Sequence, residues 1–127
     1  MKNVIFFTLL FTILNISSQN IPCSNFKTGE FKYVNPEYSE WIVKRNDSIQ
    51  VEISNKTGIE IYSLIEWNSD CEYKLTCNGV LNSNKKNIIG KIFIVSIKET
   101  NLDSYKCHLK SMDPQLKDYE LEMIKIK

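Results

Sequence analysis

The pattern that most constrains this sequence is a two-residue alternation of apolar and polar side chains, repeated in short runs from residue 26 onward. Such alternation is typical of β-strands that bury one face and expose the other. Polar, turn-forming clusters such as those at 46–48, 55–58 and 100–103 separate the runs. We therefore predict about eight short strands. They cover residues 26–34, 41–45, 49–53, 59–67, 71–77, 90–99, 104–109 and 119–127.

The turns between neighbouring strands are short, so the strands are expected to pair in sequence order as an antiparallel meander. Eight strands in this order can close into an up-and-down barrel, and closure removes the unpaired edges that promote aggregation. We therefore predict an all-β fold with a closed barrel, and a two-sheet β-sandwich is the alternative. A single helical turn is expected at 35–37, where Asn, Pro and Glu follow one another.

The first residues have the layout of a secretory signal peptide. Lys2 precedes an apolar stretch at 4–14, and small polar residues follow it up to Ser18. This stretch is shorter than the roughly 20 apolar residues that span a bilayer. We predict a signal peptide at 1–18, cleaved after its last residue. The single domain that remains, at 19–127, is expected to be secreted or periplasmic and to have no membrane span.

Four cysteines follow the predicted signal peptide, and disulfides are the default in an exported chain. Cys71 and Cys77 lie on one predicted strand about 20 Å apart, whereas a disulfide needs Cα atoms within about 7 Å. Cys23 and Cys71 fall at the same end of a meander, so we predict that they pair. Cys77 and Cys107 then form an inward-facing pair or remain free buried thiols. Lipidation of Cys23 is less favoured, because Asn, Ile and Pro precede it rather than a small residue.

Composition and the placement of polar side chains argue against several function classes. Sixteen basic and fifteen acidic residues give a net charge of +1, which disfavours nucleic-acid binding. The only histidine, His108, lies on a predicted polar face without a nucleophile placed beside it. Two pairs of carboxylates also lie on predicted outward faces, Glu60 with Glu66 and Glu120 with Glu122. We therefore predict no catalytic site, no cofactor and no metal site.

The inward positions of the predicted barrel are the candidate ligand-binding residues, because a small eight-stranded barrel is either filled by side chains or holds one small ligand. These positions are Phe31, Tyr33, Trp41, Ile61, Ile65, Trp67, Tyr73, Leu75, Tyr105 and Leu109. The strand around Phe93 is apolar on both faces. Its outer face is expected either to be covered by another segment of the chain or to dock a protein partner. Tyr62 and Leu64, on the other face of the predicted strand at 59–67, raise the same question.

Five short motifs stand out as a set. They are CSNFKTGEF (23–31), KTGIEIYSLIEW (56–67), SDCEYKL (69–75), IGK (89–91) and LEMIKIK (121–127). Together they resemble a family of small exported proteins from flavobacteria-type bacteria, across essentially the whole predicted mature chain. The resemblance implies a bacterial envelope setting and supplies no catalytic or ligand-binding residue. Some members carry the name of a DNA topoisomerase subunit, which a short, near-neutral, exported chain does not support.

A shorter likeness, at Thr28-Gly29-Glu30-Phe31, is to lipocalins and fatty-acid-binding proteins, although lipocalins usually have a tryptophan where Phe31 stands. Together with the meander, this likeness implies a lipocalin-like barrel. The sequence therefore predicts a secreted, non-catalytic binding module that holds a small apolar ligand inside or docks a protein partner on the strand around Phe93. The alternative is a structural envelope protein without a small ligand.

Overall fold

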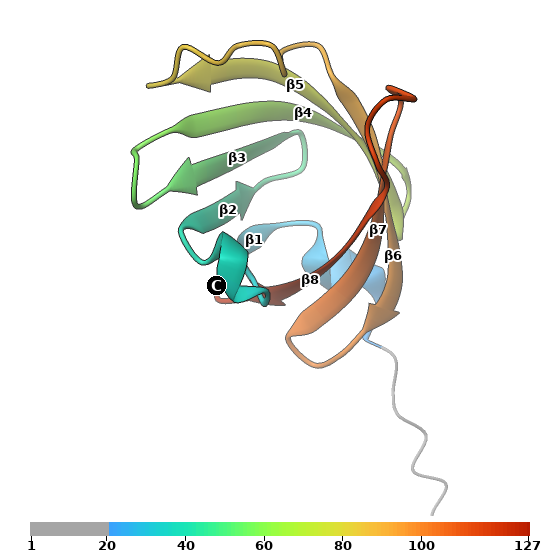
Figure 1. The fold of residues 1–127 in the computed structure, drawn as a ribbon. Helices are drawn as coiled ribbons and strands as arrows, with labels where there is room; N and C mark the ends of the chain where they lie inside the picture. The colour runs from blue at the N-terminus through green and yellow to red at the C-terminus, as the bar shows by residue number, and fades with distance from the viewer. Residues whose placement is uncertain (1–20) are drawn as a thin grey trace, which may run out of the picture.

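The computed structural model describes residues 21–127, so the signal peptide predicted at 1–18 lies outside the described residues. Within the described part, the chain forms eight antiparallel strands that close into a barrel in sequence order (Figure 1). The first strand pairs with the last, with Phe31 opposite Lys125. The prediction of a closed all-β meander is confirmed, and the sandwich alternative is wrong.

The strands follow the predicted runs closely. They are β1 (Gly29–Tyr33), β2 (Trp41–Arg45), β3 (Ile49–Ser54), β4 (Glu60–Ser69), β5 (Glu72–Leu81), β6 (Ile92–Thr100), β7 (Ser104–Ser111) and β8 (Tyr119–Lys125). Two short 3-10 helices are η1 (Cys23–Phe26), before β1, and η2 (Pro36–Tyr38), between β1 and β2. Strand β1 begins later than predicted because the chain first forms η1. The predicted helical turn is η2, where the Asn35 side chain accepts a hydrogen bond from the Glu37 backbone N–H at 3.0 Å.

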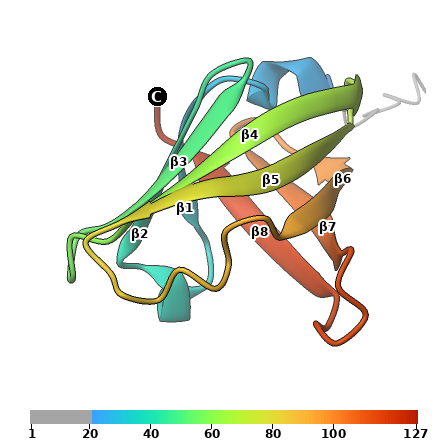
Figure 2. The same cartoon turned by 90° about the horizontal axis from the view of Figure 1, so that it is seen from above.

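The two ends of the barrel differ in what covers them. Odd-numbered strands begin at one end, which we call the closed end, and even-numbered strands begin at the other, which we call the mouth. The closed end carries η1, and the mouth carries η2 together with the loops at 82–91 and 112–118. Figure 2 shows η1 beside the end where β4 turns into β5.

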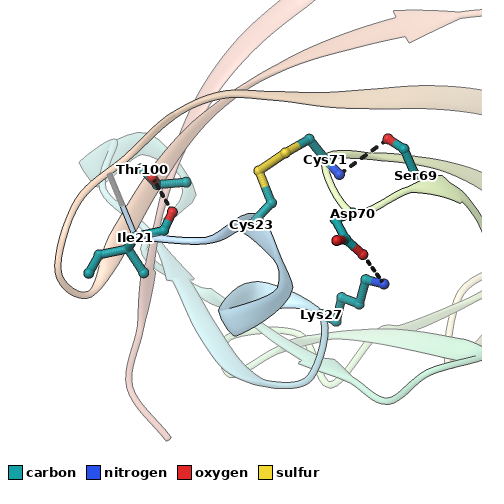
Figure 3. The surroundings of a disulfide bond; sticks show 7 residues. All are labelled: Ile21, Cys23, Lys27, Ser69, Asp70, Cys71 and Thr100. Atoms are coloured by element: carbon teal, nitrogen blue, oxygen red, sulfur yellow. Dashed lines mark hydrogen bonds and ion pairs between the residues drawn. A yellow bond between two sulfur atoms is a disulfide. The ribbon is translucent and has the colours of Figure 1, made fainter. Parts of the chain in front are cut away.

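Helix η1 plugs the closed end. Its residue Phe26 is 1% exposed and belongs to the buried core. Cys23 forms a disulfide with Cys71 at the β4–β5 turn (Figure 3), which confirms the predicted pairing. Beside the disulfide, Lys27 Nζ donates to the Asp70 carboxylate at 2.8 Å. Lipidation of Cys23 is incompatible with this arrangement, because the thiol sulfur already forms the disulfide.

The described chain also starts and ends at the closed end. The Ile21 carbonyl oxygen accepts a hydrogen bond from the Thr100 hydroxyl at 2.5 Å, and the Glu30 backbone N–H donates to the Lys127 carbonyl oxygen at 2.9 Å. Gly29 lies beside this last contact with a φ of +131°. A Cβ at this position would lie 2.4 Å from the Lys127 carbonyl oxygen, so only glycine fits here.

Candidate ligand-binding site

The barrel interior holds a cavity of about 260 Å³. Six of the predicted interior residues line it: Tyr33, Ile61, Tyr73, Leu75, Tyr105 and Leu109. Phe31 and Ile65 are buried in the core without lining the cavity. The two predicted tryptophans, Trp41 and Trp67, lie toward opposite ends of the barrel.

Much of the remaining wall was not among the predicted interior residues. The apolar additions are Val43, Ile88, Phe93, Val95, Leu121 and Met123, and the polar additions are Arg45, Gln50, Glu52 and Ser63. Phe93 packs against the core inside the barrel. The outer face of β6 is therefore made by Ile92 and Ile94, which are only partly covered, and Phe93 is not available to a partner outside.

A second pocket, of about 210 Å³, lies at the mouth, and we call it the mouth pocket. It is lined by Tyr33, Tyr38, Trp41, Glu52, Ile61, Leu109, Tyr119 and Leu121. Five of these residues, Tyr33, Glu52, Ile61, Leu109 and Leu121, also line the cavity, so the two spaces adjoin. Trp41 was predicted to lie in the interior, and the structure places it at the entrance.

Strand β3 turns its polar side chains inward and its apolar side chains outward. Gln50 and Ser54 are 5% and 1% exposed, and Glu52 between them lines the cavity. Ile49, on the outer face, is 39% exposed. Alternation alone favours the opposite orientation, because apolar side chains normally face the core. The polar face is inside because Arg45 lies opposite Gln50 on β2 and the two side chains are hydrogen-bonded there.

Arg45 forms the floor of the cavity toward the closed end. Its Nε donates to Gln50 Oε1 at 3.0 Å, and its Nη1 donates to the Phe26 carbonyl oxygen at 2.8 Å. Its Nη2 donates to the Tyr105 hydroxyl at 2.9 Å, and the guanidinium lies 4.5 Å from the centroid of the Phe31 ring. Burial by itself lowers the pKa of Arg45, but interaction with Tyr105 and its other neighbours outweighs burial and the pKa is raised. The floor is thus a permanent cation with protein acceptors on three of its N–H groups.

Glu52 faces both the cavity and the mouth pocket. The Tyr33 hydroxyl donates to its carboxylate, and Tyr33 is the only side-chain donor to it within residues 21–127. Burial raises the pKa of Glu52, although the Tyr33 hydrogen bond and the charge of Arg45 oppose the rise. Burial and the charge of Glu52 raise the pKa of Tyr33 well above its usual value, so the phenol stays a donor. In the described part of the chain, no Lys, Arg or His lies within 4.0 Å of the Glu52 carboxylate as an ion pair.

Cys77 and Cys107 line the cavity as free, buried thiols. The alternative of an inward-facing disulfide between them is therefore wrong, and the alternative of free thiols is confirmed. They come from β5 and β7, which β6 separates. Burial raises the pKa of Cys77 and raises the pKa of Cys107 to about 11. Both thiols therefore stay protonated at neutral pH.

Trp67 covers the core toward the closed end. Its ring centroid lies 4.5 Å from that of Tyr73, and Lys27 Nζ lies 5.0 Å from the centroid of the indole. The indole N–H is buried and has no acceptor among the described residues. This predicted interior residue therefore packs against the core and does not line the cavity.

The groups considered for catalysis lie on the outer surface. His108 Nε2 lies 3.4 Å from the Asp118 carboxylate, and both side chains are a third or more exposed. Glu66 pairs with Lys74 at 2.9 Å, and Glu120 is exposed. Within residues 21–127, no group of three or more His, Cys, Asp or Glu side chains is arranged to hold a metal ion.

Comparison with known proteins supplies no relative: no family model, no curated protein and no solved structure matches the chain. The resemblance to small exported proteins from flavobacteria-type bacteria therefore stays a prediction, and so does any likeness to lipocalins beyond the closed barrel itself. Among the helices of residues 21–127, none is long and apolar enough to cross a membrane.

Proposed function

We propose that this protein is an exported, non-catalytic binding barrel that holds one small, largely apolar ligand in its cavity. The observation that carries the proposal is the open interior, because about 260 Å³ is unfilled in a barrel of the size that side chains usually fill. Ligand sites in proteins typically occupy about 300–1,000 Å³. The cavity and the mouth pocket fall within that range only when they are taken together, so the site suits a ligand of low molecular weight.

The cavity adjoins the mouth pocket, so its apolar wall can be reached from outside the barrel. A ligand that covers this wall removes apolar surface from water, which is favourable by about 25 cal/mol per Å². The inward-facing side chains of Gln50 and Ser63 offer it hydrogen-bonding partners as well.

The ligand is proposed to enter through the mouth, because η1 and the buried Phe26 plug the other end of the barrel. The Cys23–Cys71 disulfide supports an oxidising compartment and agrees with the signal peptide predicted at 1–18. The proposed destination is therefore the periplasm or the exterior of a bacterial cell.

A protein-docking role is the second candidate, and the outer face of β3 and β4 favours it. Ile49 is 39% exposed and Leu64 is 45% exposed, and the two residues lie opposite each other in register. Contiguous exposed apolar side chains often mark contact surfaces. Under this alternative, the protein is a structural component of the envelope, and its cavity holds no ligand.

Native mass spectrometry of the chain, expressed with its own first 18 residues in a bacterial periplasm, tests the proposal. The expected spectrum shows cleavage after Ser18, the loss of two hydrogens to the Cys23–Cys71 disulfide and a bound small molecule. A bare chain would favour the structural alternative. An unprocessed chain would contradict the proposed signal peptide.

Two substitutions in β5 test where the small molecule binds. Cys77→Phe adds a ring inside the cavity, and Thr76→Phe places the same ring on the outer face of the same strand. The small molecule should be lost from the first variant and retained by the second. Its retention by both would show that the ligand binds outside the cavity.

A further inference from the structure

The mouth pocket combines four aromatic side chains with one carboxylate. The rings are Tyr33 from β1, Tyr38 from η2, Trp41 from β2 and Tyr119 from β8, and the carboxylate is Glu52 from β3. The face of an aromatic ring is electron-rich and attracts a cation, and proteins bind organic ammonium ions between several such faces. A nearby carboxylate adds the opposite charge.

The rings lie around the opening: Tyr33 packs against the core as well, and the other three lie outside the core cluster. Tyr33 and Tyr38 lie with their centroids 5.5 Å apart and their planes at 61°. Trp41 is half-buried, and Tyr119 is 48% exposed. Helix η2, which is capped by the Asn35 side chain, presents Tyr38 to this opening. The incompletely covered ring surfaces are therefore available to a ligand that enters the barrel.

The charges around the mouth pocket favour a cation over an anion. Of the residues that the structure describes, Glu52 is the only charged one in its lining. Arg45 lines the deeper cavity, and three of its N–H groups already donate to protein acceptors. A half-buried carboxylate is costly unless a counter-charge or hydrogen bonds compensate it, and the raised pKa of Glu52 reflects that cost. A ligand cation places a counter-charge directly beside this carboxylate, with which no Lys, Arg or His of residues 21–127 forms an ion pair, whereas an anionic ligand meets repulsion.

We infer that the ligand carries an ammonium group, which binds in the mouth pocket between the aromatic rings and Glu52 while its apolar body occupies the cavity. This inference rests on the proposed function and names the ligand class, a small primary or quaternary amine with one apolar chain or ring. The apolar side chains of Val43, Phe93, Val95 and Met123 line the cavity and suit such a body.

Four probes with the same six-carbon chain separate the head group from the tail: hexyltrimethylammonium, hexylammonium, 1-hexanol and hexanoate. Each is titrated at pH 8 by calorimetry into the oxidised chain purified from the periplasm. The two cations should bind at least about tenfold more tightly than 1-hexanol. Hexanoate should bind most weakly, because its carboxylate is repelled by Glu52.

Glu52→Gln should abolish the preference for cations over 1-hexanol and leave the binding of 1-hexanol itself. Glu60→Gln is the matched control, because Tyr62 donates to Glu60 at 2.7 Å on the outer face of β4, which reproduces the Tyr–Glu pair away from the pocket. Tyr38→Leu is a second variant, at a half-buried position outside the core. It should weaken hexyltrimethylammonium binding by about threefold to tenfold and change 1-hexanol binding by less than about twofold.

Equal affinity for all four probes, or tightest binding of hexanoate, would overturn the ammonium inference and leave the proposed binding barrel standing. A cation preference that survives both Glu52→Gln and Tyr38→Leu would also overturn it, because the head group would then bind elsewhere. No binding by any probe at millimolar concentration would overturn the inference together with the proposed small-ligand cavity.

Discussion

Removing the Cys23–Cys71 disulfide should destabilise the protein by about 4 kcal/mol. The two cysteines are 48 residues apart in the chain, and the chain-entropy relation for a loop of this length gives about 4 kcal/mol at 25 °C. The free energy of unfolding of a small domain is about 5–15 kcal/mol. The double variant Cys23→Ser/Cys71→Ser should therefore keep only part of the wild-type stability. For a domain of about 100 residues, the change corresponds to a Tm lower by about 15–20 °C.

This loss acts mainly through the unfolded chain, which becomes less restricted. In the folded state η1 keeps two other attachments, since Phe26 is buried and its carbonyl oxygen accepts from Arg45 at 2.8 Å. We therefore expect the variant to retain native NMR chemical shifts outside the segment around η1. The m value should rise, because a chain without the cross-link exposes more surface when it unfolds.

Guanidinium unfolding followed by tryptophan fluorescence measures both the free energy of unfolding and the m value. Reduced wild-type protein provides the same loss of the bond without a substitution, and Cys77→Ala is a control that changes a free thiol and should leave the m value unaltered. A stability loss below about 1 kcal/mol would refute the loop-entropy reasoning. An unchanged m value, with altered chemical shifts throughout β4 and β5, would refute it as well.

Three further predictions concern the interior. Arg45→Met should lower the free energy of unfolding, measured by urea denaturation, by about 3 kcal/mol, because three buried acceptors lose their donor. A loss under about 1 kcal/mol would show that these contacts are dispensable. Burial raises the folded-state pKa of Glu52, so wild-type protein loses stability as the pH rises through that pKa, and Glu52→Gln should not. Urea unfolding of both proteins from about pH 2.5 to 8 gives the difference between their free energies of unfolding. This difference should change with pH and become constant below about pH 3.3, one unit under the usual Glu pKa, whereas a constant difference throughout would contradict the raised pKa. Cys107, with a pKa of about 11, should react with a disulfide reagent at pH 8 at least about 100-fold more slowly in the folded protein than in denaturant, and similar rates would contradict its burial.

The strand order and the disulfide could be predicted because they depend on spacing. Alternation locates each strand, and short turns leave each strand beside the next. The rise of a strand excludes a bond between Cys71 and Cys77. The meander places Cys23 and Cys71 at the same end of the barrel, which favoured the pairing that the structure has. The start of β1 was missed because η1 depends on burying Phe26 in the core, and the local sequence does not show that long-range contact.

The orientation of β3 could not be predicted from its own residues. A period of two says that the faces differ, and it does not say which face lies inside when the barrel interior is partly polar. The partner that decides the orientation, Arg45, lies on β2 and meets Gln50 across the strand pair. Its contacts with the Phe26 carbonyl oxygen and Tyr105 bring together three distant parts of the chain.

The aromatic mouth was predicted only in part. Tyr33 and Trp41 have inward parity on their strands and were among the interior candidates. Tyr38 lies on η2, where strand parity does not apply, and Tyr119 is the first residue of β8. Only the closure of the barrel, which pairs β1 with β8, brings Tyr119 to the same opening.

The location of both ends of the described chain has a practical consequence for how the molecule can be handled. Ile21 and Lys127 are held at the closed end, and Figure 2 shows the C-terminus on the opposite side of the barrel from η2 and the mouth loops. A biotin, a fused reporter or a sensor surface coupled at either position would leave the entrance directed into solution. Coupling through lysine side chains would not orient the molecule in this way, because Lys91 is the last residue of the 82–91 loop at the mouth. Immobilised layers built through the chain ends should therefore keep a higher fraction of active binding sites than layers built through lysines.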